Sequence, residues 1–204
     1  MITIIDYGLG NIQAFVNVYK RLHIPVRVAR SVEDLAGAEK LILPGVGAFD
    51  HAMQRLDNSG MRDTVDRMVK EEKIPVLGIC VGMQMLADTS DEGQLAGLGW
   101  VPGRVRSFRS VNGLENIAMP HMGWNDVMPV NGNPLFKGFE DEARFYFLHS
   151  FYFECKQAEH GAAASNYGLD FSCAVAAENV FGVQFHPEKS HHFGVGLLKN
   201  FAEL

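Results

Sequence analysis

The fold is organised around ten residues, Pro75-Val76-Leu77-Gly78-Ile79-Cys80-Val81-Gly82-Met83-Gln84. Their first half is a short apolar run, which is typical of a buried strand in a parallel sheet. Good helix formers follow, so the sequence predicts a helix over Met83–Ala87. Between the two, the pattern Gly78-x-Cys80-x-Gly82 predicts a sharp strand-to-helix turn that carries a cysteine nucleophile.

The two glycines of this turn have a steric role. A sharp turn brings the backbones of Gly78 and Gly82 close together, so a Cβ at either position would clash. Cys80 would then lie at the N-terminus of a helix, where unpaired N–H groups and the helix dipole favour the thiolate. A free cysteine is also a common small core residue, so the motif alone leaves both interpretations open.

A second motif favours the catalytic interpretation. An apolar strand over Val180–Phe185 ends in His186-Pro187-Glu188. In extended backbone, residues i and i+2 point to the same side, so Glu188 is expected to orient the imidazole of His186. A nucleophilic cysteine with a distant histidine and carboxylate is the expected pattern, because the three groups meet in the fold and not in the sequence.

Together, residues 78–84 and His186-Pro187-Glu188 resemble the class I (triad) glutamine amidotransferases. Two further stretches, Pro44-Gly45-Val46-Gly47 and Pro120-His121-Met122-Gly123-Trp124-Asn125, are similar to the glutaminase subunits of imidazole glycerol phosphate synthase. The resemblance covers essentially the whole chain. It implies that Cys80, His186 and Glu188 hydrolyse the side-chain amide of glutamine to glutamate and ammonia.

The resemblance also implies supporting roles around this triad. The N–H of Val81, with one from Gly45-Val46-Gly47, would form an oxyanion hole, because two glycines allow the Val46 peptide to rotate. The residues alone also allow an ordinary turn there. Four residues are expected to contact the substrate. Gln84 is expected there because it lies a helical turn past Cys80, and Glu92, Ser150 and Phe151 are expected there by resemblance.

Composition limits the class of protein. The 204 residues are 47% hydrophobic, enough for one domain over 1–204, and the net charge of -6 without a basic cluster argues against nucleic-acid binding. No spanning apolar run or signal peptide is recognisable, so a cytoplasmic protein with reduced thiols is expected. The three widely spaced cysteines fit neither a disulfide framework nor a zinc site, so we expect no metal, no cofactor, and structural roles for Cys155 and Cys173.

The order of elements predicts the fold class. Strands and helices alternate at first, with Asn11 as the expected N-cap of a helix over Ile12–Leu22. Later segments are rich in strands, among them Trp100–Phe108 and Leu114–Met119. The sequence therefore predicts an α/β fold of the flavodoxin-like kind, with a central mostly parallel sheet flanked by helices and an antiparallel extension. The site is expected at the C-terminal ends of the parallel strands.

A partner is implied because no part of the sequence is recognisable as a site that uses ammonia. Free ammonia would be protonated in water and lose its nucleophilicity. By resemblance, the partner is a HisF-like cyclase subunit in a heterodimer, which makes imidazole glycerol phosphate for histidine biosynthesis. The residues expected to contact this partner are Asn11, Pro120, His121, Met122, Gly123, Trp124 and Lys189.

Two alternatives stay open. A paralogous subunit would supply ammonia to a lipopolysaccharide or surface-sugar amidation enzyme. Gly10–Phe15 favours it, since histidine-pathway members usually read Gly-Asn-x-x-Ser-Val there and this chain does not. The other alternative is a non-enzymatic binding module that kept the fold, although Cys80, His186 and Glu188 argue against it. A glutaminase assay and the identity of the partner separate these possibilities.

Overall fold

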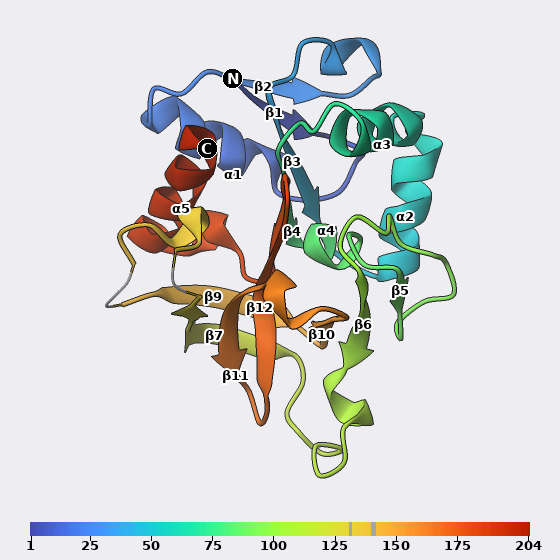
Figure 1. Ribbon diagram of the computed structural model, residues 1–204, viewed down its shortest axis with the longest axis vertical. Coiled ribbons are helices and arrows are strands. Elements are labelled where there is room, and N and C mark those ends of the chain that lie inside the picture. Colours follow the sequence, from blue (N-terminus) through green and yellow to red (C-terminus); the bar gives the residue numbers. More distant parts are fainter. Residues whose placement is uncertain (131, 140–141) are drawn as a thin grey trace.

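A computed structural model of the chain describes residues 1–130, 132–139 and 142–204. Its centre is the parallel part of a sheet, with the strand order β2-β1-β3-β4-β13 (Figure 1). Every residue of β1, β4 and β13 is buried, which explains why these segments are almost wholly apolar, with Thr3 as the one polar side chain among them. The strands are β1 Ile2–Ile5, β2 Val26–Ala29, β3 Lys40–Gly45, β4 Val76–Cys80 and β13 Val180–Val183.

The same sheet continues beyond β13 as a largely antiparallel part. The order is β12-β10-β6-β5, with β11 paired to β12 and β8 paired to β11. A mostly parallel sheet with an antiparallel extension confirms the predicted fold class. These strands are β5 Thr89–Ser90, β6 Gly103–Ser107, β8 Met128–Pro129, β10 Phe151–Cys155, β11 Gly161–Asn166 and β12 Asp170–Ala177.

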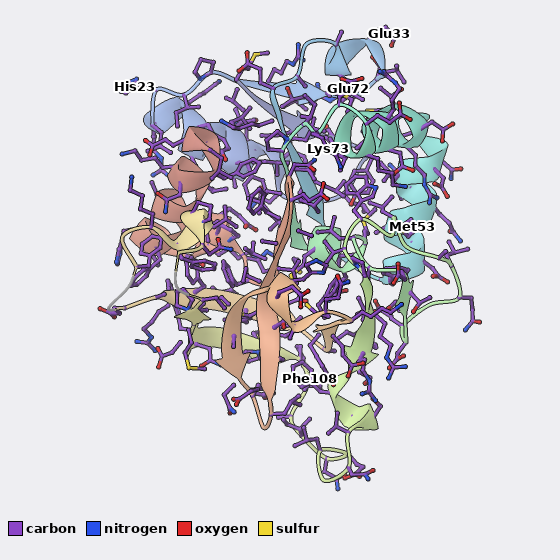
Figure 2. The ribbon with its side chains drawn as sticks, viewed as in Figure 1. His23, Glu33, Met53, Glu72, Lys73 and Phe108 are labelled. Carbon is purple, nitrogen blue, oxygen red and sulfur yellow. The ribbon has the colours of Figure 1, made fainter. Side chains whose placement is uncertain are left out.

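Helices cover both faces of the parallel part. In Figure 1, α1 (Ile12–Arg21) and α5 (His191–Glu203) lie on one side of it, and α2 (Phe49–Asn58) and α3 (Arg62–Lys70) lie on the other. Each helix buries an apolar stripe, which in α2 includes Met53, labelled in Figure 2. Short 3-10 turns lie at Glu33–Leu35, Phe108–Ser110, Pro134–Phe136, Ala158–His160 and Pro187–Lys189. Within the described ranges, the helices lack the combined length and apolar character that crossing a membrane requires.

A second, smaller sheet was not foreseen from the sequence. It is an antiparallel ribbon of β7 (His121–Asp126) and β9 (Arg144–His149), in the lower left of Figure 1. The sequence predicted a strand over Leu114–Met119 instead, and this was wrong. That segment folds into turns, in which the N–H of Ile117 donates to the carbonyl of Leu114. The strand begins only after Pro120, since a proline has no N–H to donate to a ladder.

Three local predictions also need correction. The strand expected over Trp100–Phe108 begins only at Gly103, because the N–H groups of Trp100 and Val101 donate to the carbonyl of Leu86. The helix expected over Met83–Ala87 is a single turn, α4 (Val81–Gln84). It does not continue because the carbonyl of Leu86 accepts from the N–H groups of Trp100 and Val101 and not from the next turn of a helix. Asn11 is the N-cap residue of α1, but its side chain makes no capping hydrogen bond. Its backbone dihedral angles lie outside the extended region that N-cap residues usually adopt.

Candidate active site

A pocket of about 300 Å³ opens at the C-terminal ends of β3, β4 and β13. Several segments far apart in the sequence contribute to its wall, as expected for a site at this edge of a parallel sheet. Most of the residues predicted for the site lie around it. The lining residues are Val46, Gly47, Cys80, Val81, Gln84, Glu92, Pro120, Leu148, His149, Ser150, Phe151, His186 and Lys189.

Cys80 occupies a strained turn between β4 and α4. Its backbone has φ 56° and ψ -113°, a region that non-glycine residues rarely adopt. Close approach of the backbone around it confirms the steric role of the glycines. A Cβ at Gly82 would lie 1.9 Å from the carbonyl oxygen of Leu43, and one at Gly78 would lie 2.6 Å from the carbonyl oxygen of Gly82. The elbow therefore depends on glycine at both positions.

His186 follows β13 and is paired with Glu188. Its Nδ1 lies 2.9 Å from Oε1 of Glu188, and both side chains are buried. Burial lowers the pKa of His186, but the hydrogen bonds and charges of Cys80 and Glu188 outweigh it and raise the pKa to about 9. The imidazole is therefore held in its charged form at neutral pH, beside the sulfur and the carboxylate.

A buried amide near Cys80 was missed from the sequence. Gln184 is fully buried, and its Nε2 lies 3.9 Å from the sulfur of Cys80. Its Oε1 accepts a hydrogen bond of 3.1 Å from Nε2 of Gln84. The available signal was a glutamine inside the apolar run that leads to His186, where a polar side chain needs a buried partner.

The glycine-rich loop lies directly against the elbow. Gly45 is the last residue of β3 and pairs with Cys80, and a Cβ on it would lie 2.4 Å from the N atom of Gly82. Val46 and Gly47 then line the pocket, with Val46 40% exposed and Gly47 at φ 85°. The structure thus brings the predicted oxyanion loop, Val81 and Cys80 to one place.

The four predicted substrate contacts also line this pocket. Gln84 is buried and donates from Nε2 to the carbonyl of Phe151, at 3.4 Å. Glu92 accepts from the N–H of Phe49 at 2.9 Å, so its carboxylate lies at the N-terminus of α2. Ser150 and Phe151 form the corner between β9 and β10.

The residues predicted to contact a partner lie in different environments. Met122 and Trp124 are 63% and 41% exposed on β7, while Pro120 and Lys189 line the pocket. Asn11 is exposed, and Gly123 lies between Met122 and Trp124 with φ 127°. His121 differs from its neighbours, since its side chain is 4% exposed and faces His149. Its imidazole is therefore directed into the protein and not toward a partner.

The other two cysteines lie away from this pocket. Cys173 is buried in β12, and burial raises the pKa of its thiol. Cys155 ends β10 beside Ser172, and burial raises the pKa of its thiol too. Over the described part of the chain, no group of three or more His, Cys, Asp or Glu side chains is arranged to hold a metal ion.

These features define a class of protein, and comparison with known sequences identifies it. The sequence model of the family described as "Glutamine amidotransferase class-I" matches residues 3–203, and the chain belongs to this family. Among solved structures, one described as glutamine amidotransferase covers 100% of this chain and 99% of its own, with a TM-score of 0.76 at 20% identity. A chain of the structure of PurLQS from Thermotoga maritima has a TM-score of 0.75 at 16% identity. The match covers 99% of this chain and 97% of that one.

Closer relatives share one particular name. The chain is 70% identical over 204 residues to imidazole glycerol phosphate synthase subunit HisH of Bdellovibrio bacteriovorus, with 100% of both chains covered. It is 50% identical to the HisH subunit of Leptospira borgpetersenii, again over 100% of both. These close relatives are HisH subunits of imidazole glycerol phosphate synthase.

Proposed function

We propose that the chain is the glutaminase subunit of an imidazole glycerol phosphate synthase, with Cys80, His186 and Glu188 as its catalytic triad. The observation that carries this proposal is their arrangement at one edge of the sheet. Cys80 and His186 line one pocket, and Oε1 of Glu188 lies 2.9 Å from Nδ1 of His186. Identity of 70% over the full length of a HisH subunit supports the same activity.

The chemistry would proceed in two halves. The Cys80 thiolate attacks the carboxamide carbon of glutamine, and the imidazolium of His186 gives its proton to the departing nitrogen as the C–N bond breaks. Ammonia leaves, and a glutamyl thioester remains on Cys80. His186 then takes a proton from water as that water attacks the thioester, which releases glutamate. Glu188 orients the ring and stabilises its cation.

The oxyanion formed in each half needs hydrogen-bond donors. We assign the N–H of Val81 and one N–H from Gly45–Gly47, because both segments border Cys80 in the pocket. Loss of one such donor costs about 10²–10³ in turnover. The glycines on both sides of Val46 leave its peptide free to rotate, so a partner that selects the inward orientation would raise activity.

Binding of glutamine is assigned to the remaining wall. Gln84, Glu92 and the backbone at Ser150 and Phe151 line the pocket, and Glu92 supplies the negative charge that an α-amino group requires. This carboxylate already accepts from the N–H of Phe49, which holds it in place. No cofactor is needed for this hydrolysis.

A HisF-like cyclase is the proposed acceptor of the ammonia, in the histidine pathway. Met122 and Trp124 offer exposed apolar anchors on β7, and Pro120, from the same segment, borders the pocket. A partner docked on this strand would therefore lie beside the site where ammonia forms. We infer that Asn11, Gly123 and Lys189 belong to the same contact.

Steady-state release of glutamate from glutamine tests the proposal. We expect little activity from the chain alone and at least a tenfold increase with the cyclase and its nucleotide substrate. Cys80→Ala should abolish the activity, whereas Cys155→Ala, a matched change outside the pocket, should retain it. Stimulation by a sugar-amidating synthase and not by the cyclase would contradict the proposed partner.

A further inference from the structure

Two buried imidazoles lie outside the proposed triad. His121 begins β7 and His149 ends β9, and the two residues are directly paired across the ribbon. The Nδ1 of His121 lies 2.9 Å from the Nε2 of His149. Their exposed fractions are only 4% and 6%, so this hydrogen bond is shielded from water.

The neighbours of the pair determine which nitrogen carries each proton. The carbonyl of Phe151 can only accept, so the Nδ1 of His149, 2.7 Å away, is the protonated nitrogen. The Nε2 of His149 must then accept from the Nδ1 of His121. The Nε2 of His121 in turn accepts from Nδ2 of Asn125, at 3.2 Å. Both rings are satisfied as neutral imidazoles, and burial lowers their pKa values to about 4 for His121 and about 3 for His149.

Aromatic contacts hold the two rings in these orientations. The ring of His121 stacks on Phe147 and Tyr167, with centroid distances of 4.8 Å and 4.1 Å. The ring of His149 contacts Phe108, labelled in Figure 2, and Phe171, at 5.5 Å and 5.3 Å. Neither imidazole can turn without disturbing this aromatic cluster.

The pair acts on the wall of the active site. The Phe151 carbonyl that accepts from His149 also accepts from Gln84, and Gln84 is linked through Gln184 to the sulfur of Cys80. Residues 148–151, on the strand corner that His149 ties down, all line the pocket. The chain of hydrogen bonds from Asn125 ends on a carbonyl oxygen, which has no proton to pass on, so its role is geometric and not acid–base.

We propose that His121 and His149 are positioning residues for glutamine, because their hydrogen bond fixes the Phe151 carbonyl and with it the pocket wall at residues 148–151. This inference rests on the proposed glutaminase function and deepens it. The pair touches no reacting atom. Its loss weakens the binding of a glutamine-shaped molecule and leaves the intrinsic reactivity of Cys80 unchanged.

The test compares two reagents that alkylate Cys80 in the full-length chain. One is a chloroketone analogue of glutamine, which must bind in the pocket, and the other is iodoacetamide, which needs no amino-acid contacts. His149→Leu removes both hydrogen bonds and should raise the half-saturation concentration of the analogue by about tenfold, as loss of a buried hydrogen bond predicts. Its rate with iodoacetamide should stay within about twofold of the wild type, since the chain of bonds carries no proton.

Matched variants separate positioning from a general structural role. His149→Asn keeps an amide N–H near the position of Nδ1 and should restore most of the binding. His121→Phe keeps the stacking but leaves the Nε2 of His149 without its donor, and should show a smaller loss. His192→Leu, an exposed position on α5, should behave as wild type.

The outcomes are distinguishable. If the half-saturation concentration of the analogue were the same as in the wild type for both His149→Leu and His121→Phe, the positioning role would be overturned. An equal fall with both reagents would also overturn it, because the pair would then govern the thiol or the fold. Failure of the wild-type chain to react with the analogue while iodoacetamide reacts would instead remove the proposed glutaminase function.

Discussion

The imidazole of His186 contacts the carboxylate of Glu188 through a tight turn, in which Pro187 begins a 3-10 helix. The pairing of these residues was expected from the sequence, but through extended backbone, and that geometry was wrong. The contact of 2.9 Å forms because His186 itself stays extended while the chain turns immediately after it. Both side chains are thereby brought to the same side and buried together.

This contact predicts the alkaline limit of activity. The pKa of His186 is raised to about 9, so the imidazolium that we propose protonates the departing nitrogen is lost above that pH. Glu188→Gln removes one of the charges that raise this pKa, so the alkaline limb of kcat/KM should move down by about one pH unit or more. Glu188→Gln should also cost less activity than His186→Ala, since the Glu188 side chain transfers no proton in the proposed mechanism. An unmoved limb would show that the charge of Glu188 does not raise the pKa of His186. An activity loss in Glu188→Gln as large as that in His186→Ala would contradict the orienting role.

Selective labelling is expected at one cysteine. Cys80 lines the pocket, whereas burial raises the pKa of the thiols of Cys155 and Cys173. Peptide mass spectrometry after limited reaction with a glutamine-like electrophile should find the label on Cys80 alone. Cys80→Ala should take up none, and Cys155→Ala should react at the wild-type rate. Even labelling of the three thiols would contradict the assignment.

The elbow should be intolerant of the smallest substitution. Gly82→Ala places a Cβ 1.9 Å from the carbonyl oxygen of Leu43, which belongs to a central strand and cannot move aside. We expect the free energy of unfolding to fall by about 3 kcal/mol. Gly113→Ala is the control, because its φ is 87° but nothing lies within 4 Å, so only about 1 kcal/mol of backbone strain is expected. Equal losses in urea denaturation would refute the steric argument.

The buried histidines should make the fold sensitive to acid. In the unfolded chain their pKa returns to about 6.5, above the native values of about 4 for His121 and 3 for His149. The unfolded state therefore binds more protons, so stability is present above pH 6.5 and is lost as pH falls toward the native values. Each ring should contribute a loss on the order of 1–2 kcal/mol between pH 6.5 and 5. His149→Asn should show a shallower pH dependence of unfolding than wild type, and His192→Leu the same slope. Parallel curves for all three proteins would show that His149 is not held neutral.

Much of the fold followed from local pattern. The continuous apolar runs at β1, β3 and β4 are strands of the parallel sheet, and the helices between them bury the stripes that their spacing indicates. The elbow at Cys80 was recognisable because only glycine permits backbones to approach so closely. The elbow, the loop after β3 and His186 were expected in one place, since the C-terminal ends of parallel strands meet at one edge of a sheet. Glu92, Ser150 and Phe151 were expected there by resemblance alone.

The sequence did not determine the pairing of short strands or the polar contacts between residues that are far apart in the chain. The ribbon of β7 and β9, the link from Gln184 to Cys80, and the His121–His149 pair depend on partners 18 to 104 residues away. His121 stands in a motif that resembles a partner-binding segment, and only the fold shows its side chain turned inward, onto Phe147 and Tyr167. A local pattern specifies which faces of a strand or helix are apolar, because that depends on period alone. The direction in which a buried polar side chain points depends on where another chain segment supplies its hydrogen-bond partner, and tertiary structure decides that.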